Sequence, residues 1–115
     1  MNKRATCHCG NITIEVNQAP DIITDCQCSI CRRYAALWAY YAPDEVVISH
    51  REQPSEFYIW NDRDIEFHHC TLCHCITHYQ TTEQCEVDVV AVNARMFNDL
   101  PIDSIPVRKI ARQEN

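Results

Sequence analysis

The sequence predicts a mainly β fold in which short strands are held together by cysteine-rich, metal-binding segments. Short runs that alternate polar and apolar residues, or that are rich in β-branched and aromatic residues, recur along the chain with turn signals between them. Eight of the nine cysteines lie in three tight clusters. The 115 residues are expected to form one domain, spanning 1–115, which is large enough to bury a hydrophobic core.

Seven segments have the composition of a strand, and their spacing is typical of a β-sandwich or a folded-over sheet. The last of them contains Pro106, which restricts it to a sheet edge because proline has no backbone N–H. The predicted strands are 11–16, 36–41, 45–50, 55–60, 65–70, 86–92 and 105–110. Their large aromatic side chains are expected in the core rather than along a substrate site: Trp38, Tyr40, Phe57 and Trp60.

Two short helices are expected beside these strands. One spans 29–34 with Ser29 as its N-cap, since a serine oxygen can accept a hydrogen bond from a free N–H of the first turn. The other spans 94–98 with Asn93 as its cap. The residues after 110 are expected to be frayed, as chain ends commonly are.

Charge and hydropathy exclude several classes of protein. The formal net charge is −6 and no polybasic tract is present, so we expect no binding to nucleic acid. No run of about 18 apolar residues could span a membrane, and the N-terminal segment lacks the apolar stretch of a signal peptide. We therefore expect a cytoplasmic protein. In that reducing compartment clustered cysteines favour metal binding, whereas in a secreted chain they would indicate disulfides. The oligomeric state is not predicted.

The three clusters place cysteines only one or two residues apart. Such neighbours rarely form a disulfide with each other, because the bond requires a particular Cα separation and dihedral angle, but they can direct two sulfurs at one tetrahedral metal ion. Cys85 lies outside the clusters and is expected to be a buried, inert thiol. The clusters are Cys7-His8-Cys9-Gly10, Cys26-Gln27-Cys28-Ser29-Ile30-Cys31 and Cys70-Thr71-Leu72-Cys73-His74-Cys75.

The first and third clusters can together supply a closed zinc site. Cys7 and Cys9 provide one pair of thiolates, and Cys70 and Cys73 provide the other. Four thiolates around one zinc ion are typical of a structural site. Joining the two pairs would tie the N-terminal segment to the middle of the chain.

The middle cluster offers three sulfurs from one local segment, from Cys26, Cys28 and Cys31. Three protein ligands and an open position are how catalytic zinc sites are built, because the open position can bind a substrate thiol or water. Arg32 and Arg33 follow directly and can offset thiolate charge or hold a substrate carboxylate. The alternative is that these two arginines belong to a solvated helix face.

The order Cys-x-Cys-Gly, Cys-x-Cys-x-x-Cys-Arg and Cys-x-x-Cys resembles the glutathione-dependent formaldehyde-activating enzyme family, also called the Gfa or CENP-V family. The resemblance covers about residues 5 to 92. It implies small packed antiparallel sheets and two zinc ions. One would be structural, held by Cys7, Cys9, Cys70 and Cys73, and the other would be held by Cys26, Cys28 and Cys31. It also implies a carbon–sulfur lyase that combines glutathione with formaldehyde at the second metal.

The chain departs from the family pattern at a few positions. His74 stands where a glycine usually follows the third cluster's second cysteine, and Ala35 or Ala36 replaces a glycine that is common after Cys-Arg. Cys75 is an additional thiol, which can either complete the middle cluster or point into a core or turn. His8, His74 and His78 can bind zinc through their imidazoles or be solvated or hydrogen-bonded instead.

Two functions follow as hypotheses. The first is a zinc-dependent carbon–sulfur lyase that acts on a glutathione-type thiol and a small aldehyde, with Cys26, Cys28 and Cys31 holding the working zinc and Arg32 and Arg33 binding the substrate. The second is a non-catalytic zinc module that carries a small thiol or binds a protein partner. A third alternative is an iron–sulfur protein, because thiolates also hold such clusters.

Overall fold

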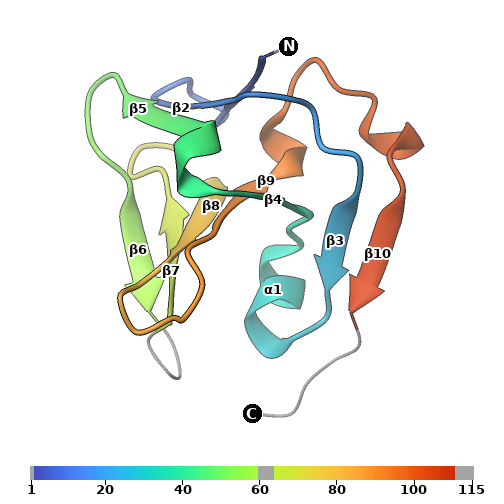
Figure 1. Ribbon diagram of the computed structural model, residues 1–115. Helices are drawn as coiled ribbons and strands as arrows, with labels where there is room; N and C mark the ends of the chain where they lie inside the picture. The colour runs from blue at the N-terminus through green and yellow to red at the C-terminus, as the bar shows by residue number, and fades with distance from the viewer. Residues whose placement is uncertain (1, 60–63, 111–115) are drawn as a thin grey trace.

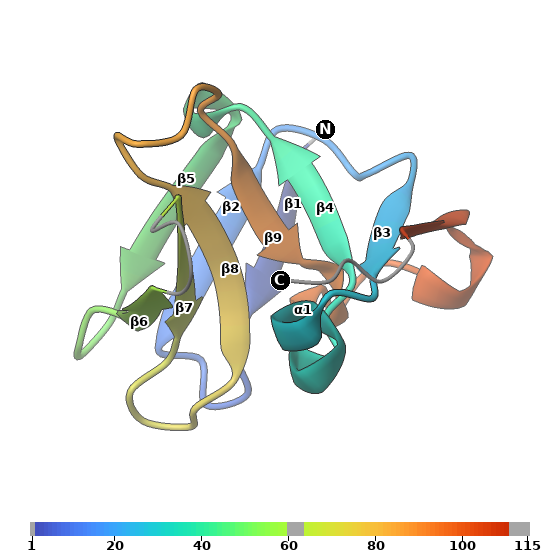
Figure 2. The same ribbon diagram turned by 90° about the horizontal axis from the view of Figure 1, so that it is seen from below.

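The structure, a computed structural model, describes residues 2–59 and 64–110. One of its two sheets has three antiparallel strands in the order β1-β2-β5, of which Figure 1 labels β2 and β5 and Figure 2 labels all three. These strands are β1 (Lys3–Thr6), β2 (Ile12–Val16) and β5 (Val46–His50). Along β2 every second side chain is buried, which matches the alternation of apolar and polar residues in its sequence.

The second sheet has seven strands in the order β10-β3-β4-β9-β8-β7-β6. Neighbouring strands are antiparallel except for β10, which runs parallel to β3 at the edge. The strands are β3 (Ile23–Cys26), β4 (Trp38–Tyr41), β6 (Glu56–Ile59), β7 (Ile65–His69), β8 (Ile76–Thr81), β9 (Val90–Asn93) and β10 (Val107–Ile110). The prediction of a mainly β fold built from antiparallel sheets is confirmed.

The helices in the part of the chain that the structure describes are each only three to six residues long. The α-helix α1 (Ser29–Tyr34) lies alongside β3 (Figure 1). Three single turns of 3₁₀-helix are η1 (Pro43–Glu45), η2 (Ala94–Met96) and η3 (Ile102–Ser104). None of the helices in the described segments is long and apolar enough to cross a membrane.

The two faces of the seven-stranded sheet bury different cores. One face packs against the three-stranded sheet, which lies behind β4, β8 and β9 in Figure 2. The opposite face packs against α1. Strand β4 shows the division, because Ala39 and Tyr41 belong to the first core while Trp38 belongs to the second. The middle cysteine cluster lies on the α1 face and is thereby separated from the three-stranded sheet.

Several sequence predictions about strands needed correction. The segment 86–92 forms a strand only from Val90 onward, and Val87 in the preceding loop is 61% exposed. The sequence reasoning also missed β1, β3 and β8. Each of these strands is only four to six residues long and carries charged or polar residues, such as Asp25 and Gln80, within the strand. The edge position predicted for residues 105–110 is confirmed by β10.

The helix predictions were correct in position and partly wrong in detail. The N-cap of α1 is Cys28 rather than Ser29, because the Cys28 sulfur accepts a hydrogen bond from the Cys31 amide at 3.4 Å. The second expected helix is the 3₁₀ turn η2, since Phe97 is already extended. Asn93 does cap that turn, accepting from the Arg95 amide at 3.2 Å.

The expected aromatic core is also only partly correct. Trp38 is fully buried, whereas Tyr40 is 40% and Phe57 48% exposed. Phe57 is exposed because β6 is the edge strand of its sheet, and Tyr40 lies at the rim of the α1 face. Trp60 and the tail expected to fray, 111–115, lie outside the described residues.

Two side chains other than glycine occupy left-handed backbone conformations among the described residues. They are Ala35, with φ of 55°, and His74, with φ of 65°. Both coincide with the sequence departures at which the family pattern has glycine. Ala35 ends α1, and its N–H donates to the carbonyls of Arg32 and Cys31. A residue with a Cβ is strained in this conformation by roughly 1–2 kcal/mol, whereas glycine is not.

We therefore predict that Ala35→Gly raises the free energy of unfolding by about 0.5–1 kcal/mol, after the backbone entropy of glycine is subtracted. Urea unfolding of the metal-loaded protein measures the change. Ala36→Gly is the matched control, because Ala36 is buried and lacks a positive φ, so the same substitution should destabilise. Destabilisation of similar size by both substitutions would show that Ala35 is not strained.

Candidate metal centres

The first candidate metal centre is a compact set of four sulfurs. The Sγ atoms of Cys7, Cys9, Cys70 and Cys73 all lie within 4.8 Å of one another. The Cys7–Cys9 and Cys9–Cys70 sulfur distances are 3.6 and 3.7 Å. Four sulfurs at ~2.3 Å from one tetrahedral zinc ion would be about 3.8 Å apart. The donor set and its spacing therefore fit a tetrahedral metal ion, and no disulfide forms among these cysteines.

Two tight turns hold these four sulfurs in place. Cys7 follows β1, and the chain turns back at Gly10, where φ is +83° and the N–H donates to the Cys7 carbonyl at 3.1 Å. Cys70 follows β7, and a similar turn brings the His74 N–H to the Cys70 carbonyl at 2.9 Å. The left-handed conformations of Gly10 and His74 close these turns and bring each cysteine pair together.

Backbone amides surround the sulfurs of the first centre and favour their ionised forms. The Ile12 N–H donates to Cys7 Sγ at 3.2 Å, and the Leu72 N–H donates to Cys70 Sγ at 3.3 Å. Burial opposes the ionisation of Cys73, but hydrogen bonds from the backbone amides of Cys75 and Cys9 outweigh it and lower its pKa to about 6. The Asn11 amide favours ionisation of Cys9, but burial and the neighbouring Cys7 and Cys70 thiols outweigh it and raise its pKa to about 12. Cys70 and Cys73, whose pKa values are lowered, are thus the thiols most ready to bind a cation as thiolates.

The second candidate centre has three sulfurs. The Sγ atoms of Cys26, Cys28 and Cys31 lie within 4.8 Å of one another. Cys26 ends β3 and Cys31 lies in the first turn of α1, so the strand, the intervening loop and the helix each contribute one sulfur. The indole Nε1–H of Trp38 donates to Cys31 Sγ at 3.3 Å. Cys31 is buried, whereas Cys26 and Cys28 are partly exposed, which leaves one side of the group accessible.

The three thiols of the second centre differ in acidity. Burial raises the pKa of Cys28, but hydrogen bonds from the Cys31 and Ile30 amides outweigh it, so the net pKa lies below the ordinary value. Burial raises the pKa of Cys26. Burial likewise raises the pKa of Cys31, although the Trp38 indole opposes the shift. Cys28, at the N-cap of α1, is therefore the first of the three to ionise.

An aromatic surface borders this centre on the α1 face of the sheet. The Trp38 and Tyr79 rings meet edge to face at 4.8 Å, and Phe67 lies 5.7 Å from Tyr34. Burial raises the pKa of Tyr79 and of Tyr40, so both phenols stay protonated and can donate hydrogen bonds at neutral pH. The sequence did not predict that the Tyr40 and Tyr79 hydroxyls border the three-cysteine centre. The alternation of side chains along strands could have placed both tyrosines on the face of Cys26, but β3 and β8 had not been recognised as strands.

The two arginines predicted to bind substrate lie on different sides of α1. Arg33 donates to the Ser29 carbonyl at 2.7 Å and to its hydroxyl at 3.3 Å, on the exposed surface of the helix. Arg32 lines a cavity of about 200 Å³ together with Asp25 and Arg95. Because Asp25 precedes Cys26 on β3, this cavity lies on the opposite face of the strand from the Cys26 sulfur.

Cys75 lies at the first centre rather than the second. Its thiol is hydrogen-bonded to Cys73 and to the backbone of His8, and burial raises its pKa. Cys75 therefore does not complete the middle cluster, which was one of the two alternatives open from sequence. It packs instead against the core next to the first centre. Cys85 is partly exposed and lies in the loop before β9, which corrects the expectation of a buried thiol.

The candidate histidines do not join either sulfur group in the described residues. His78 is buried, and its ring stacks on His68 at 4.4 Å while Nδ1 is hydrogen-bonded to the Thr77 hydroxyl at 2.8 Å. Burial lowers the pKa of His78 to about 3, so this ring is a neutral core residue. His8 and His74 are exposed.

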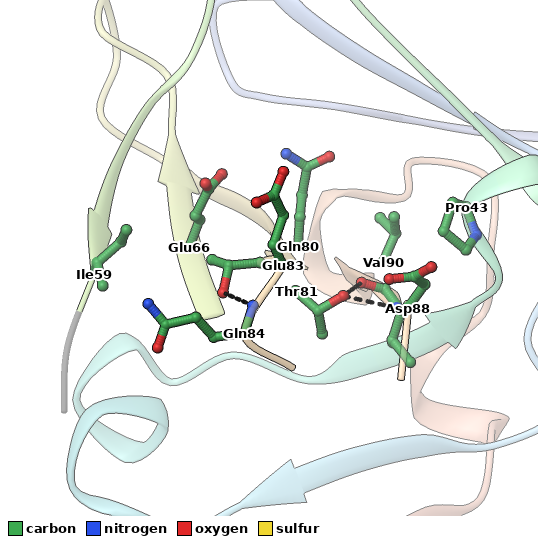
Figure 3. Close-up of a pocket in the computed structure, with 11 residues that line it drawn as sticks. Pro43, Ile59, Glu66, Gln80, Thr81, Glu83, Gln84, Asp88 and Val90 are labelled. Carbon is green, nitrogen blue, oxygen red and sulfur yellow. Dashed lines mark hydrogen bonds between the residues drawn. The ribbon is translucent and has the colours of Figure 1, made fainter. Parts of the chain in front are cut away.

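A larger cavity of about 600 Å³ lies away from both centres, and no cysteine lines it. Figure 3 shows Glu66, Gln80 and Glu83 beside one another there, and the Thr81 hydroxyl is hydrogen-bonded to the backbone of Val89, just before β9. Carboxylates and amides dominate the lining, in contrast to the sulfur and aromatic groups around the three-cysteine centre. Although this cavity is larger than the one that Arg32 lines, it contains none of the sulfur ligands of either candidate metal centre.

Comparison with known proteins places these features in a family. The model of the glutathione-dependent formaldehyde-activating enzyme family matches residues 2–111. A crystal structure of a Rhodobacter sphaeroides protein, from a structural genomics programme, is similar over 96% of this chain and 100% of its own, with 26% identity and a TM-score of 0.77. No curated protein gives a significant match. The family match extends over nearly the whole sequence, and the chain belongs to the glutathione-dependent formaldehyde-activating enzyme family.

Proposed function

We propose that this protein is a zinc-dependent carbon–sulfur lyase that combines a glutathione-type thiol with a small aldehyde, with one structural and one working zinc ion per chain. The observation that carries the proposal is the difference between the two centres, one with four sulfurs and one with three partly exposed sulfurs. When bound at the second centre, zinc would favour the thiolate form of the substrate and polarise the aldehyde oxygen.

The proposed reaction needs neither an oxidant nor a reductant. The substrate sulfur attacks the carbonyl carbon of formaldehyde and a C–S bond forms. The π electrons of the carbonyl move to oxygen, and the proton released by the thiol ends on that oxygen. The product is an S-hydroxymethyl thioether (a hemithioacetal), and the reverse reaction returns the two substrates.

The residues of the second centre have distinct roles in this proposal. Cys26, Cys28 and Cys31 hold the metal, and the indole of Trp38 fixes the Cys31 sulfur. The aromatic surface formed by Trp38 and its neighbours limits the access of water, which strengthens electrostatic interactions at the reacting atoms. The role predicted for Arg32 and Arg33 in holding a substrate carboxylate stays a prediction, and Arg32 lines a cavity on the face of β3 opposite to the Cys26 sulfur.

A non-catalytic zinc module that carries a small thiol is the second candidate. One observation favours it. The three-sulfur group contains no histidine, aspartate or glutamate among the described residues, so no such side chain in the group can move a proton. Binding of glutathione without turnover would be the behaviour of this carrier.

The zinc-loaded protein should accelerate formation of S-hydroxymethylglutathione from glutathione and formaldehyde above the uncatalysed rate. Cys28→Ser should reduce that rate by at least about 100-fold, since even residues that only support metal ligands are worth 10–100-fold. NMR exchange between free and adduct formaldehyde measures it. Cys85→Ser is the control, because Cys85 lies outside both sulfur groups. A wild-type rate equal to the uncatalysed rate would reject the lyase and leave the carrier.

Loss of a sulfur should have different effects on stability at the two centres. Cys73→Ser should destabilise the fold by on the order of 5 kcal/mol, because a closed zinc site contributes much of the stability of a small domain. Cys28→Ser should cost about 1 kcal/mol or less, because serine is itself a preferred N-cap. Chemical denaturation followed by circular dichroism separates the two. Equal losses of stability would contradict the division into a structural and a working centre.

A further inference from the structure

A third arginine shares a sheet face with the three-cysteine centre. Strand β10 pairs in parallel with β3, so that Arg108 is opposite Thr24 and Ile110 is opposite Cys26. Paired residues of neighbouring strands point to the same face, and so do residues two apart on one strand. Arg108, Thr24 and Cys26 therefore lie on the same face. The hydrogen bond from Arg108 Nη2 to Thr24 Oγ1, at 3.0 Å, establishes this orientation for the guanidinium.

The register of β3 relates Thr24, the hydrogen-bond partner of Arg108, to Cys26. Thr24 and Cys26 are two residues apart, which separates their side chains by about 7 Å along the strand. Thr24 is fully buried, whereas Arg108 is exposed. The hydrogen bond to Thr24 thus holds the exposed guanidinium beside the residue that precedes Cys26 on the same face of β3.

The other basic side chains near the second centre are differently placed. Arg33 is hydrogen-bonded to Ser29, and Arg32 lines the cavity on the Asp25 side of β3. Lys109 pairs with Asp25 and so points to that same opposite face. Of these side chains, Arg108 is the one on the face of the Cys26 sulfur, and among the described residues its guanidinium donates to Thr24 alone.

Hydroxyl groups continue the same surface from Arg108 toward the aromatic side chains. Tyr40 lies on this face of β4, is 40% exposed, and its ring meets that of Tyr79 edge to face with the centroids 6.3 Å apart. A neutral phenol beside a guanidinium can complete the hydrogen bonds of a bound carboxylate. The surface thus presents one cation and a neutral donor beside three sulfurs, on a chain whose formal net charge is −6.

We propose that Arg108 binds the carboxylate of the thiol substrate, so that the site requires a thiol that also carries a carboxylate. The inference rests on the proposed function, in which the sulfur of that thiol reaches the three-cysteine centre. Glutathione meets the requirement through its terminal carboxylates, and 2-mercaptoethanol has the sulfur without the carboxylate. Arg108 would therefore favour glutathione over 2-mercaptoethanol, because a guanidinium forms paired hydrogen bonds with a carboxylate and 2-mercaptoethanol has none.

Calorimetry on the zinc-loaded protein tests this assignment with glutathione and 2-mercaptoethanol as the two probes. Arg108→Gln should weaken glutathione binding by about tenfold, the loss typical of one hydrogen bond to a charged group, while 2-mercaptoethanol binding stays unchanged. Arg108→Lys should recover part of the loss, since it keeps the charge but not the fork geometry. Arg4→Gln, which removes the same charge from an exposed position on β1, should leave both affinities unchanged.

Unaltered glutathione affinity in Arg108→Gln, or a loss in Arg33→Gln instead, would overturn the role of Arg108 and leave the proposed function standing. An equal loss of both thiols in Arg108→Gln would also overturn it, because the arginine would then only support the fold of the sheet edge. If neither thiol binds the wild-type protein, the proposed function fails and the assignment of Arg108 fails with it.

Discussion

Four thiols from two turns, 61 residues apart between Cys9 and Cys70, meet within 4.8 Å, and this convergence joins the two sheets. Cys7 and Cys9 connect two strands of the three-stranded sheet, while Cys70 and Cys73 connect β7 and β8 of the seven-stranded sheet. Uncompensated thiolates this close would repel one another, so the arrangement depends on protons or on a cation. A metal ion in this position would supply that positive charge. It would also link the β1–β2 turn to the β7–β8 turn and so stabilise the core packed between the two sheets.

The second centre lies on the opposite face of the seven-stranded sheet, so it shares no core residues with the first centre. Its sulfurs come from one segment of six residues, so a metal ion there would close no long loop. What surrounds it is a surface of tyrosine, tryptophan and phenylalanine side chains, with Arg108 at the edge of the sheet. The chain thereby keeps a site that could contribute much to stability apart from a site that is partly exposed to solvent.

The sequence predicted features that depend on residues close together in the chain, and it did not predict features that depend on which strands pair. Cysteine spacing was enough to group the seven sulfurs that the structure brings together, and Pro106 was enough to place the last strand at an edge. Strand β3 escaped recognition because Thr24 and Asp25 interrupt its apolar pattern. Without β3, the parallel pairing of β10 that places Arg108 on the face of Cys26 could not be predicted. The position of Cys75 was equally beyond reach, since only the turn at His74 directs its thiol toward the first centre.

The most direct test of this account is metal analysis of freshly purified, reduced protein, combined with X-ray absorption to give the average number of sulfur ligands per ion. The account predicts two zinc ions per chain, one with four sulfur ligands and one with three, and loss of the fold when a strong chelator removes the first. Protein that contains no bound transition metal and remains folded in chelator would contradict it.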